Sequence, residues 1–121
     1  MNRKEIAIDF LKLAGLGKVN AAFNKYVSAE FIHHNQYFEG SKDALLKAMQ
    51  DAHDTNPNKS IDIKQCFEDQ NTVITHSLVC KADLDIAVVH IFKFNSENKI
   101  TELWDLGQII DKDSPNTNGL F

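Results

Sequence analysis

The hydrophobic pattern changes its period near residue 60, and this change constrains the fold more than any other feature. Before it, apolar residues recur at helical spacing in three segments, residues 3–14, 18–26 and 41–53. After it, strand-like patterns cover residues 60–67, 72–81, 84–94 and 99–110. Three helices come first, and four strands joined by short turns follow. This order predicts an α+β fold. In this fold three N-terminal helices pack on one face of a strongly curved antiparallel sheet.

The segments outside these elements are short. Ser28 is placed to cap a short helical turn over residues 29–31. Residues 32–38 read as an extended piece or a loop, and Gly40 interrupts the chain before Ser41 caps the third helix. The last eleven residues, which carry Pro115, two Asn and a Gly, read as a tail without regular structure.

Length and composition indicate one globular domain over residues 1–121. The net charge of −4 and the lack of a basic patch argue against a nucleic-acid partner. No apolar run is long enough for a signal peptide or a membrane span, so we expect no membrane contact and a cytoplasmic location. Cys66 and Cys80 lie far apart in strand-like segments, which favours free thiols. No metal-ligand spacing is present, and we expect no metal and no other cofactor.

An acidic residue interrupts the apolar pattern of the last strand. Asp105 shares a strand face with Leu103 and Ile109, whereas Ile100 and Trp104 lie on the other face. A strand that is apolar on both faces is covered on both, so Asp105 is expected in an apolar environment. A carboxylate there needs partners, or its pKa changes. Asp105 is therefore either an acid that bonds nearby backbone at a bulge or rim, or a functional group.

Histidines supply possible partners for this acid. His76 lies in the second strand, and His90 interrupts an otherwise apolar run in the third. Each is either a core histidine satisfied by one hydrogen bond or part of a site, and the loop pair His34–Asn35 is either a solvated turn or part of it. If these side chains converge with Asp105 on one concave face, they can act as general acids or bases near neutral pH.

The remaining aromatic and histidine side chains are weaker candidates for a functional site. Tyr26 and Trp104 can bring a hydroxyl or an indole N–H to a pocket, or they only pack in the core. We expect His33 and His53 to be exposed. The sequence holds no Gly-x-Ser-x-Gly turn for a serine nucleophile and no glycine-rich phosphate loop.

Several motifs resemble those of the SnoaL-like polyketide cyclases, a family within the nuclear transport factor 2-like superfold. They are YVSAEFIHHN at 26–35, Glu39-Gly40, IFKF at 91–94, KITELWDLGQ at 99–108 and the tail NTNGLF at 116–121. The resemblance covers nearly the whole chain. It implies a cone-shaped roll around a pocket, a homodimer formed through the sheet, and acid–base chemistry without a metal.

Individual residues match this family in different degrees. Trp104 and Asp105 resemble its Trp-Asp pair, in which the Asp is the acid or base. His34 and Asn35 resemble its His-Asn element. Leu103 stands where close members carry His before Trp-Asp, and His90 stands where they usually carry Asp before Ile-Phe.

Two hypotheses follow for the function. In the first, Asp105 takes a proton from the carbon next to the carbonyl of a small apolar compound, leading to aldol-type cyclisation or isomerisation. His90 or His76, with His34, then polarises the carbonyl oxygen, and the substrate contacts are Trp104, Tyr26, Asn35 and Leu103. In the second, the same pocket of a dimer binds a small ligand without catalysis. Water activation by Asp105, as in an epoxide hydrolase, needs a second pocket acid, and the sequence shows no candidate.

Overall fold

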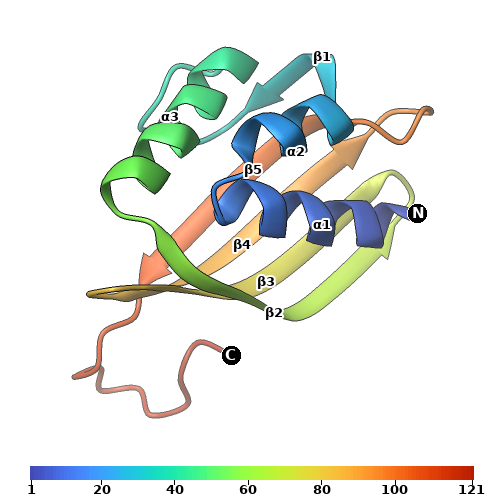
Figure 1. The fold of residues 1–121 in the computed structure, drawn as a ribbon. Coiled ribbons are helices and arrows are strands. Elements are labelled where there is room, and N and C mark those ends of the chain that lie inside the picture. Colours follow the sequence, from blue (N-terminus) through green and yellow to red (C-terminus); the bar gives the residue numbers. More distant parts are fainter.

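The computed structural model describes all 121 residues and has the α+β architecture that the sequence predicts (Figure 1). The helices are α1 (Arg3–Gly15), α2 (Val19–Tyr26) and α3 (Lys42–Thr55). The strands are β1 (Val27–His33), β2 (Asn58–Asp69), β3 (Thr72–Lys81), β4 (Asp85–Phe94) and β5 (Ile100–Ile109). The three predicted helices and four predicted strands are all present, with bounds that differ by at most two residues.

The strands form one curved sheet that does not close into a barrel, with the order β1-β5-β4-β3-β2. Strands β2 to β5 form an antiparallel meander, as predicted. Strand β1 was not predicted from the sequence. It pairs in parallel with β5 through Ile32 and His33. The predicted helical turn over residues 29–31 is therefore wrong. Pairing with the edge of β5 overrides the weak local preference of this segment.

Side-chain caps begin two of the helices. Asn2 and Glu5 form a reciprocal capping box at the start of α1. The Ser41 hydroxyl accepts from the Ala44 amide at the start of α3. Gly17 makes the turn between α1 and α2. Its φ of 105° is positive, a backbone conformation that residues with a side chain rarely adopt. None of the helices combines the length and hydropathy needed to span a bilayer.

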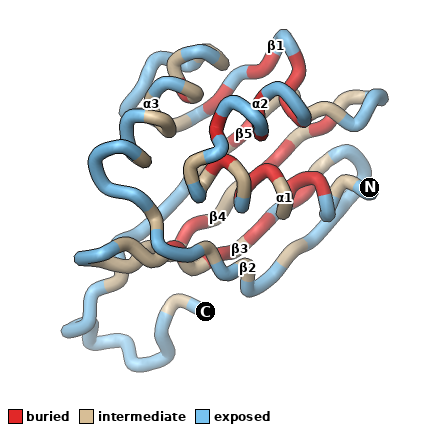
Figure 2. The backbone as a smooth tube through the Cα atoms, viewed as in Figure 1, coloured by how far each residue is buried: buried red, intermediate tan, exposed pale blue.

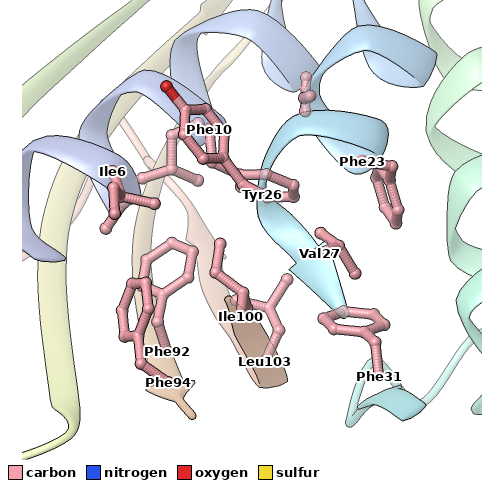
Figure 3. Packing of buried hydrophobic residues seen from close by; sticks show 14 of the residues in the cluster. Ile6, Phe10, Phe23, Tyr26, Val27, Phe31, Phe92, Phe94, Ile100 and Leu103 are labelled. Atoms are coloured by element: carbon pink, nitrogen blue, oxygen red, sulfur yellow. The ribbon is translucent and has the colours of Figure 1, made fainter. Parts of the chain in front are cut away.

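The core lies between α1, α2 and one face of the sheet, which we call the inner face (Figures 1 and 2). Phe10 from α1, Phe23 from α2, and Phe92 and Ile100 from the sheet are almost wholly inaccessible to solvent (Figure 3). The Phe10 ring contacts Phe23 and meets Phe92 edge-on with a centroid separation of 6.1 Å. This packing fills one end of the space under the helices with apolar side chains.

Two β-bulges decide which residues face inward. In β5 the register shifts by one residue at Thr101, so that Ile100 and Leu103 both point to the inner face. The prediction that Ile100 lies opposite Leu103 is therefore wrong. In β2 the register shifts at Lys64, so that Ile63 faces inward and Gln65 faces outward. After the bulge in β5, Leu103 and Asp105 share the inner face, as predicted.

Candidate functional site

A pocket of about 780 Å³ opens beside the core, between the inner face of the sheet and the ends of the helices. Leu11 and Gly15 of α1 and Met49 of α3 line one side, together with the loop at residues 34–37. The inner faces of β2 to β5 line the other side, with Ile61, Val79, Ile86, Val88, Gly107 and Ile109. The larger part of the exposed pocket wall is therefore apolar, as in ligand-binding cavities, although several polar side chains, among them Asn58 and Lys81, also line it.

Two polar groups of the pocket, His90 and Asp105, belong to one cross-strand row of the inner face. The pairing of β2 to β5 places Cys66, Thr75, His90 and Asp105 side by side. On one side of this row lie the core residues Val73, Phe92 and Leu103, and on the other side lie the rows that line the pocket. The row thus stands at the deep end of the pocket, where apolar core gives way to open space.

Asp105 points into the pocket and contacts two polar partners there. Its Oδ1 atom lies 3.6 Å from His90 Nε2, and its Oδ2 atom accepts a hydrogen bond of 3.2 Å from Asn35 Nδ2. The side chain of His90 is 14% exposed and that of Asp105 is 36% exposed. The structure therefore brings together Asp105, His90 and Asn35, three of the residues that the sequence pointed to.

Burial lowers the pKa of His90 below its ordinary value of 6.5, and the negative charge of Asp105 opposes this shift. His90 is therefore neutral at pH 7. A neutral imidazole that faces a carboxylate holds its proton on the facing nitrogen, which is Nε2 here. His90 can thus direct an N–H group at Asp105 or at a ligand oxygen beside it.

The burial of His90 predicts a pH-dependent stability. Because its folded-state pKa is lowered, unfolded chains bind a proton below about pH 6.5 that folded chains do not. We expect the full contribution of neutral His90 to the free energy of unfolding above that pH. On acidification toward the folded-state pKa, the free energy of unfolding should fall by up to about 1.4 kcal/mol per pH unit. Urea unfolding of the wild type and His90→Gln between pH 7.5 and 5.5 measures this. A wild type that gains stability relative to the variant on acidification would contradict it.

The loop that carries Asn35 is held by His33. The backbone N–H of Asn35 donates to His33 Nδ1 at 3.1 Å, and His33 Nε2 donates to the backbone carbonyl of Glu39 at 2.7 Å. His33 is 6% exposed, so the prediction that it is exposed is wrong. The reason is the pairing of β1 with β5, which places His33 beside Leu103. His53, also predicted to be exposed, is half-buried and lies against Gly17.

His34 and Trp104 lie at the rim of the pocket and not at its floor. The His34 ring stacks on Trp104 with a centroid separation of 4.5 Å, and His34 Nε2 lies 2.7 Å from Glu102 Oε2. Glu102 and Trp104 belong to the face of β5 that does not carry Asp105, which we call the outer face. His34 borders the pocket from the strand edge, but its ring nitrogen is engaged on the outer face.

His76 does not belong to the site. Its strand neighbours Thr75 and Ser77 face inward, so His76 projects from the outer face. There its Nδ1 atom lies 3.0 Å from Gln65 Nε2, and its ring stacks on Phe121 of the tail. The predicted convergence of His76 with Asp105 is therefore wrong. Side chains alternate along β3, and this alternation places His76 on the outer face while Asp105 lies on the inner face.

Tyr26 and Leu103 also lie outside the pocket. Leu103 is buried in the core next to Phe92. Tyr26 is 5% exposed, and its hydroxyl donates to the Asp9 carboxylate at the other end of the core. Both predictions of a substrate contact fail because these residues fill the part of the inner face that the helices cover.

Sequence reasoning missed polar residues that flank His76. Thr75 and Ser77 are fully buried on the inner face, and Ser77 lines the pocket. Strict alternation in β3 was the signal, because a strand that turns His76 outward must turn both neighbours inward. Cys66 and Cys80 are free, as predicted. No three His, Cys, Asp or Glu side chains gather as a metal site requires.

No family model matches the sequence, and no curated protein is similar to it in sequence. Solved structures do match. An NTF-2-like protein of unknown function from Burkholderia xenovorans superimposes with a TM-score of 0.73 at 14% identity, covering 95% of this chain and 88% of that one. The chain has the nuclear transport factor 2-like fold. This finding confirms the predicted fold class, with the qualification that the curved sheet is open.

Two further structures with this fold carry names that refer to an activity. A candidate SnoaL-like polyketide cyclase from Shewanella denitrificans matches with a TM-score of 0.70 at 15% identity, covering 88% of this chain and 90% of that one. AclR, a candidate hydroxylase from Streptomyces galilaeus, matches with a TM-score of 0.71 at 17% identity, covering 88% and 78%. What this chain shares with them is the nuclear transport factor 2-like fold.

Proposed function

We propose that the chain is a SnoaL-like protein that performs acid–base chemistry on a small carbonyl compound, without a metal or organic cofactor. The observation that supports this most directly is the contact of Asp105 with the buried, neutral His90 at the deep end of a largely apolar pocket. A carboxylate in such a place is accessible to a ligand and shielded from most of the solvent. The motif resemblance and the fold of a candidate SnoaL-like cyclase agree with this proposal.

The proposed reaction begins when Asp105 removes a proton from the carbon next to the carbonyl group of the ligand. The electron pair of that C–H bond moves to the carbonyl oxygen and forms an enolate. In an isomerisation, Asp105 returns the proton to a different carbon. In an aldol-type cyclisation, the enolate carbon attacks a second carbonyl of the same molecule, and the new alkoxide takes up the proton. Both sequences balance without a co-reactant.

The oxygen that gains charge needs a hydrogen-bond donor nearby. His90 Nε2–H fits this role best, because it is buried and already directed at the space beside Asp105. Asn35 Nδ2 holds the other carboxylate oxygen and orients it. We retain His34 only as a rim residue that contacts the ligand, since its ring is occupied by Trp104 and Glu102. Asp105→Asn is the direct test, because the amide keeps the shape and removes the basic oxygen.

A binding module without catalysis is the alternative, and the apolar wall of the pocket is the observation that favours it. In that case Asp105 and His90 only orient a ligand. NMR titration of both side chains separates the two proposals. Coupled titration of the pair that changes when a carbonyl ligand binds supports catalysis. Independent titration of the two groups, with no change on binding, supports a purely binding role.

We also propose a cytoplasmic homodimer that forms through the outer face of the sheet. Phe67, Ile74 and Leu106 expose 56%, 37% and 53% of their surface there, and a second copy would cover them. Light scattering coupled to size-exclusion chromatography measures the mass directly. A monomer at micromolar concentration would remove the dimer from the proposal and leave the pocket chemistry as it stands.

A further inference from the structure

Strand β1 ends beside β5 at the edge of the sheet, and the next two residues stay in contact with β5 (Figure 1). The backbone N–H of His34 donates to the backbone carbonyl of Leu103 at 2.9 Å. The His34 ring stacks on Trp104, and the side chain of Asn35 donates to Asp105. Two consecutive residues after β1 thus contact two consecutive residues of β5.

These two side-chain contacts lie on opposite faces of the sheet. Neighbouring residues of a strand point to opposite sides, so Trp104 lies on the outer face and Asp105 on the inner face. On the outer face, His34 Nε2 lies 2.7 Å from Glu102 Oε2 and donates to it, because a carboxylate only accepts. The planes of the His34 and Trp104 rings differ by 11°. The imidazole is therefore held both by stacking and by a charged hydrogen-bond acceptor.

The loop that follows β1 has few other contacts that fix it relative to β5. The side-chain hydrogen bonds of His33 stay within residues 33–39. Asn35 Oδ1 accepts from the Tyr37 backbone N–H at 3.0 Å, which leaves Asn35 Nδ2 to reach the carboxylate on β5. Tyr37 itself is 79% exposed, so packing of its ring does little to hold the loop. The position of Asn35 on β5 therefore depends mainly on the contacts of His34.

We propose that Glu102 is a positioning residue that orients Asp105 from the opposite face of the sheet. Together with Trp104, Glu102 fixes the His34 ring and with it the start of the loop. Asn35 is the next residue, and it holds the carboxylate of Asp105 in place. Glu102 does not line the pocket and does not touch a ligand there. This inference rests on the proposed function for the role of Asp105 as the base.

The test follows the side-chain NH₂ group of Asn35 by saturation-transfer NMR, which measures its hydrogen exchange with water. Asp105→Ala removes the acceptor and gives the exchange rate of the released group. In Glu102→Ala we expect exchange about three- to tenfold faster than in the wild type, as for the loss of one partly exposed, charged hydrogen bond. Glu102→Gln keeps an acceptor oxygen and should restore most of the protection. Glu97→Ala, which removes an exposed acid from the β4–β5 turn, should leave the rate unchanged.

His34→Ala tests whether the effect passes through the imidazole. We expect exchange of the Asn35 group to rise at least as much as in Glu102→Ala, and the double variant to show no further rise. His34 lies in a loop, so this variant keeps the test valid even if a change within β5 disturbs the sheet. Additive effects of the two changes, a wild-type rate in Glu102→Ala, or an equal rise in Glu97→Ala would overturn the inference.

These measurements need no turnover, which separates this inference from the proposed reaction. With an accepted substrate, kcat of Glu102→Ala should fall by the same three- to tenfold while KM stays near the wild-type value, because Glu102 does not touch the ligand. Turnover that depends on Asp105, with an Asn35 signal that ignores Glu102, would refute the positioning role alone. An Asn35 signal that follows Glu102, with turnover that ignores Asp105, would refute the proposed reaction alone.

Discussion

Asp105→Asn is expected to lower turnover of an accepted carbonyl substrate by about 100- to 10 000-fold, the range that a positioned general base contributes. The amide keeps the size of the side chain and can still contact Asn35 and His90, but it has no oxygen basic enough to remove a proton from carbon. Binding should change far less than turnover, because the shape of the pocket is preserved. Steady-state kinetics with a substrate found by screening small carbonyl compounds measures both quantities.

The matched control is Asp62→Asn. Asp62 is an exposed acid of β2 whose Oδ2 atom lies 2.6 Å from Lys64 Nζ, away from the pocket. It undergoes the same chemical change and loses the same charge, so turnover should stay near the wild-type value. Equal turnover in wild type and Asp105→Asn would refute Asp105 as the base. The binding module would then be the better account of the pocket.

Phe92→Ala is expected to lower the free energy of unfolding by about 3–5 kcal/mol, the range for deleting a buried aromatic ring. Phe92 has no exposed surface, packs edge-on against Phe10 and lies 6.0 Å from the ring of His90. The cavity left behind would border the polar row of the inner face. Urea unfolding at pH 7.5 measures the loss, and a shortened side chain here should also loosen His90.

Phe67→Ala serves as the comparison for this variant. Phe67 lies on the outer face and is 56% exposed, so its removal from a monomer should cost well under half as much. Measuring both variants at low protein concentration keeps any dimer from contributing. Similar losses for the two would mean that Phe92 packs less tightly than the structure shows.

The sequence predicted the elements well because most of them satisfy a single strong pattern. The stripes of α1 and α3 and the alternation in β3 each follow one period over ten or more residues. Strand β1 was missed because its seven residues gain their structure from pairing with β5. No pattern within the segment itself encodes that partner.

The site was predicted in part for a related reason. Asp105 and His90 were recognised because each is a polar residue in an apolar run, and they proved to be direct cross-strand partners. His76 was grouped with them on residue type, although its parity in β3 excludes it. Tyr26 was selected for its hydroxyl, which Asp9 occupies. Residue type thus identified candidates, and only the register of the sheet decided which of them meet.

The bulge at Thr101 decides which face of the sheet Asp105 occupies relative to Ile100. Ile100 and Asp105 are five positions apart, an odd separation that would send them to opposite sides of an unbroken strand. The one inserted residue lets the first complete the core while the second enters the pocket. A chain of the same length that paired without the bulge would turn either Ile100 or Asp105 to the outer face, although it kept every letter of the Trp-Asp motif. A Trp-Asp pair in another chain therefore does not by itself show that the acid faces the pocket; the pairing register of its strand must show it as well.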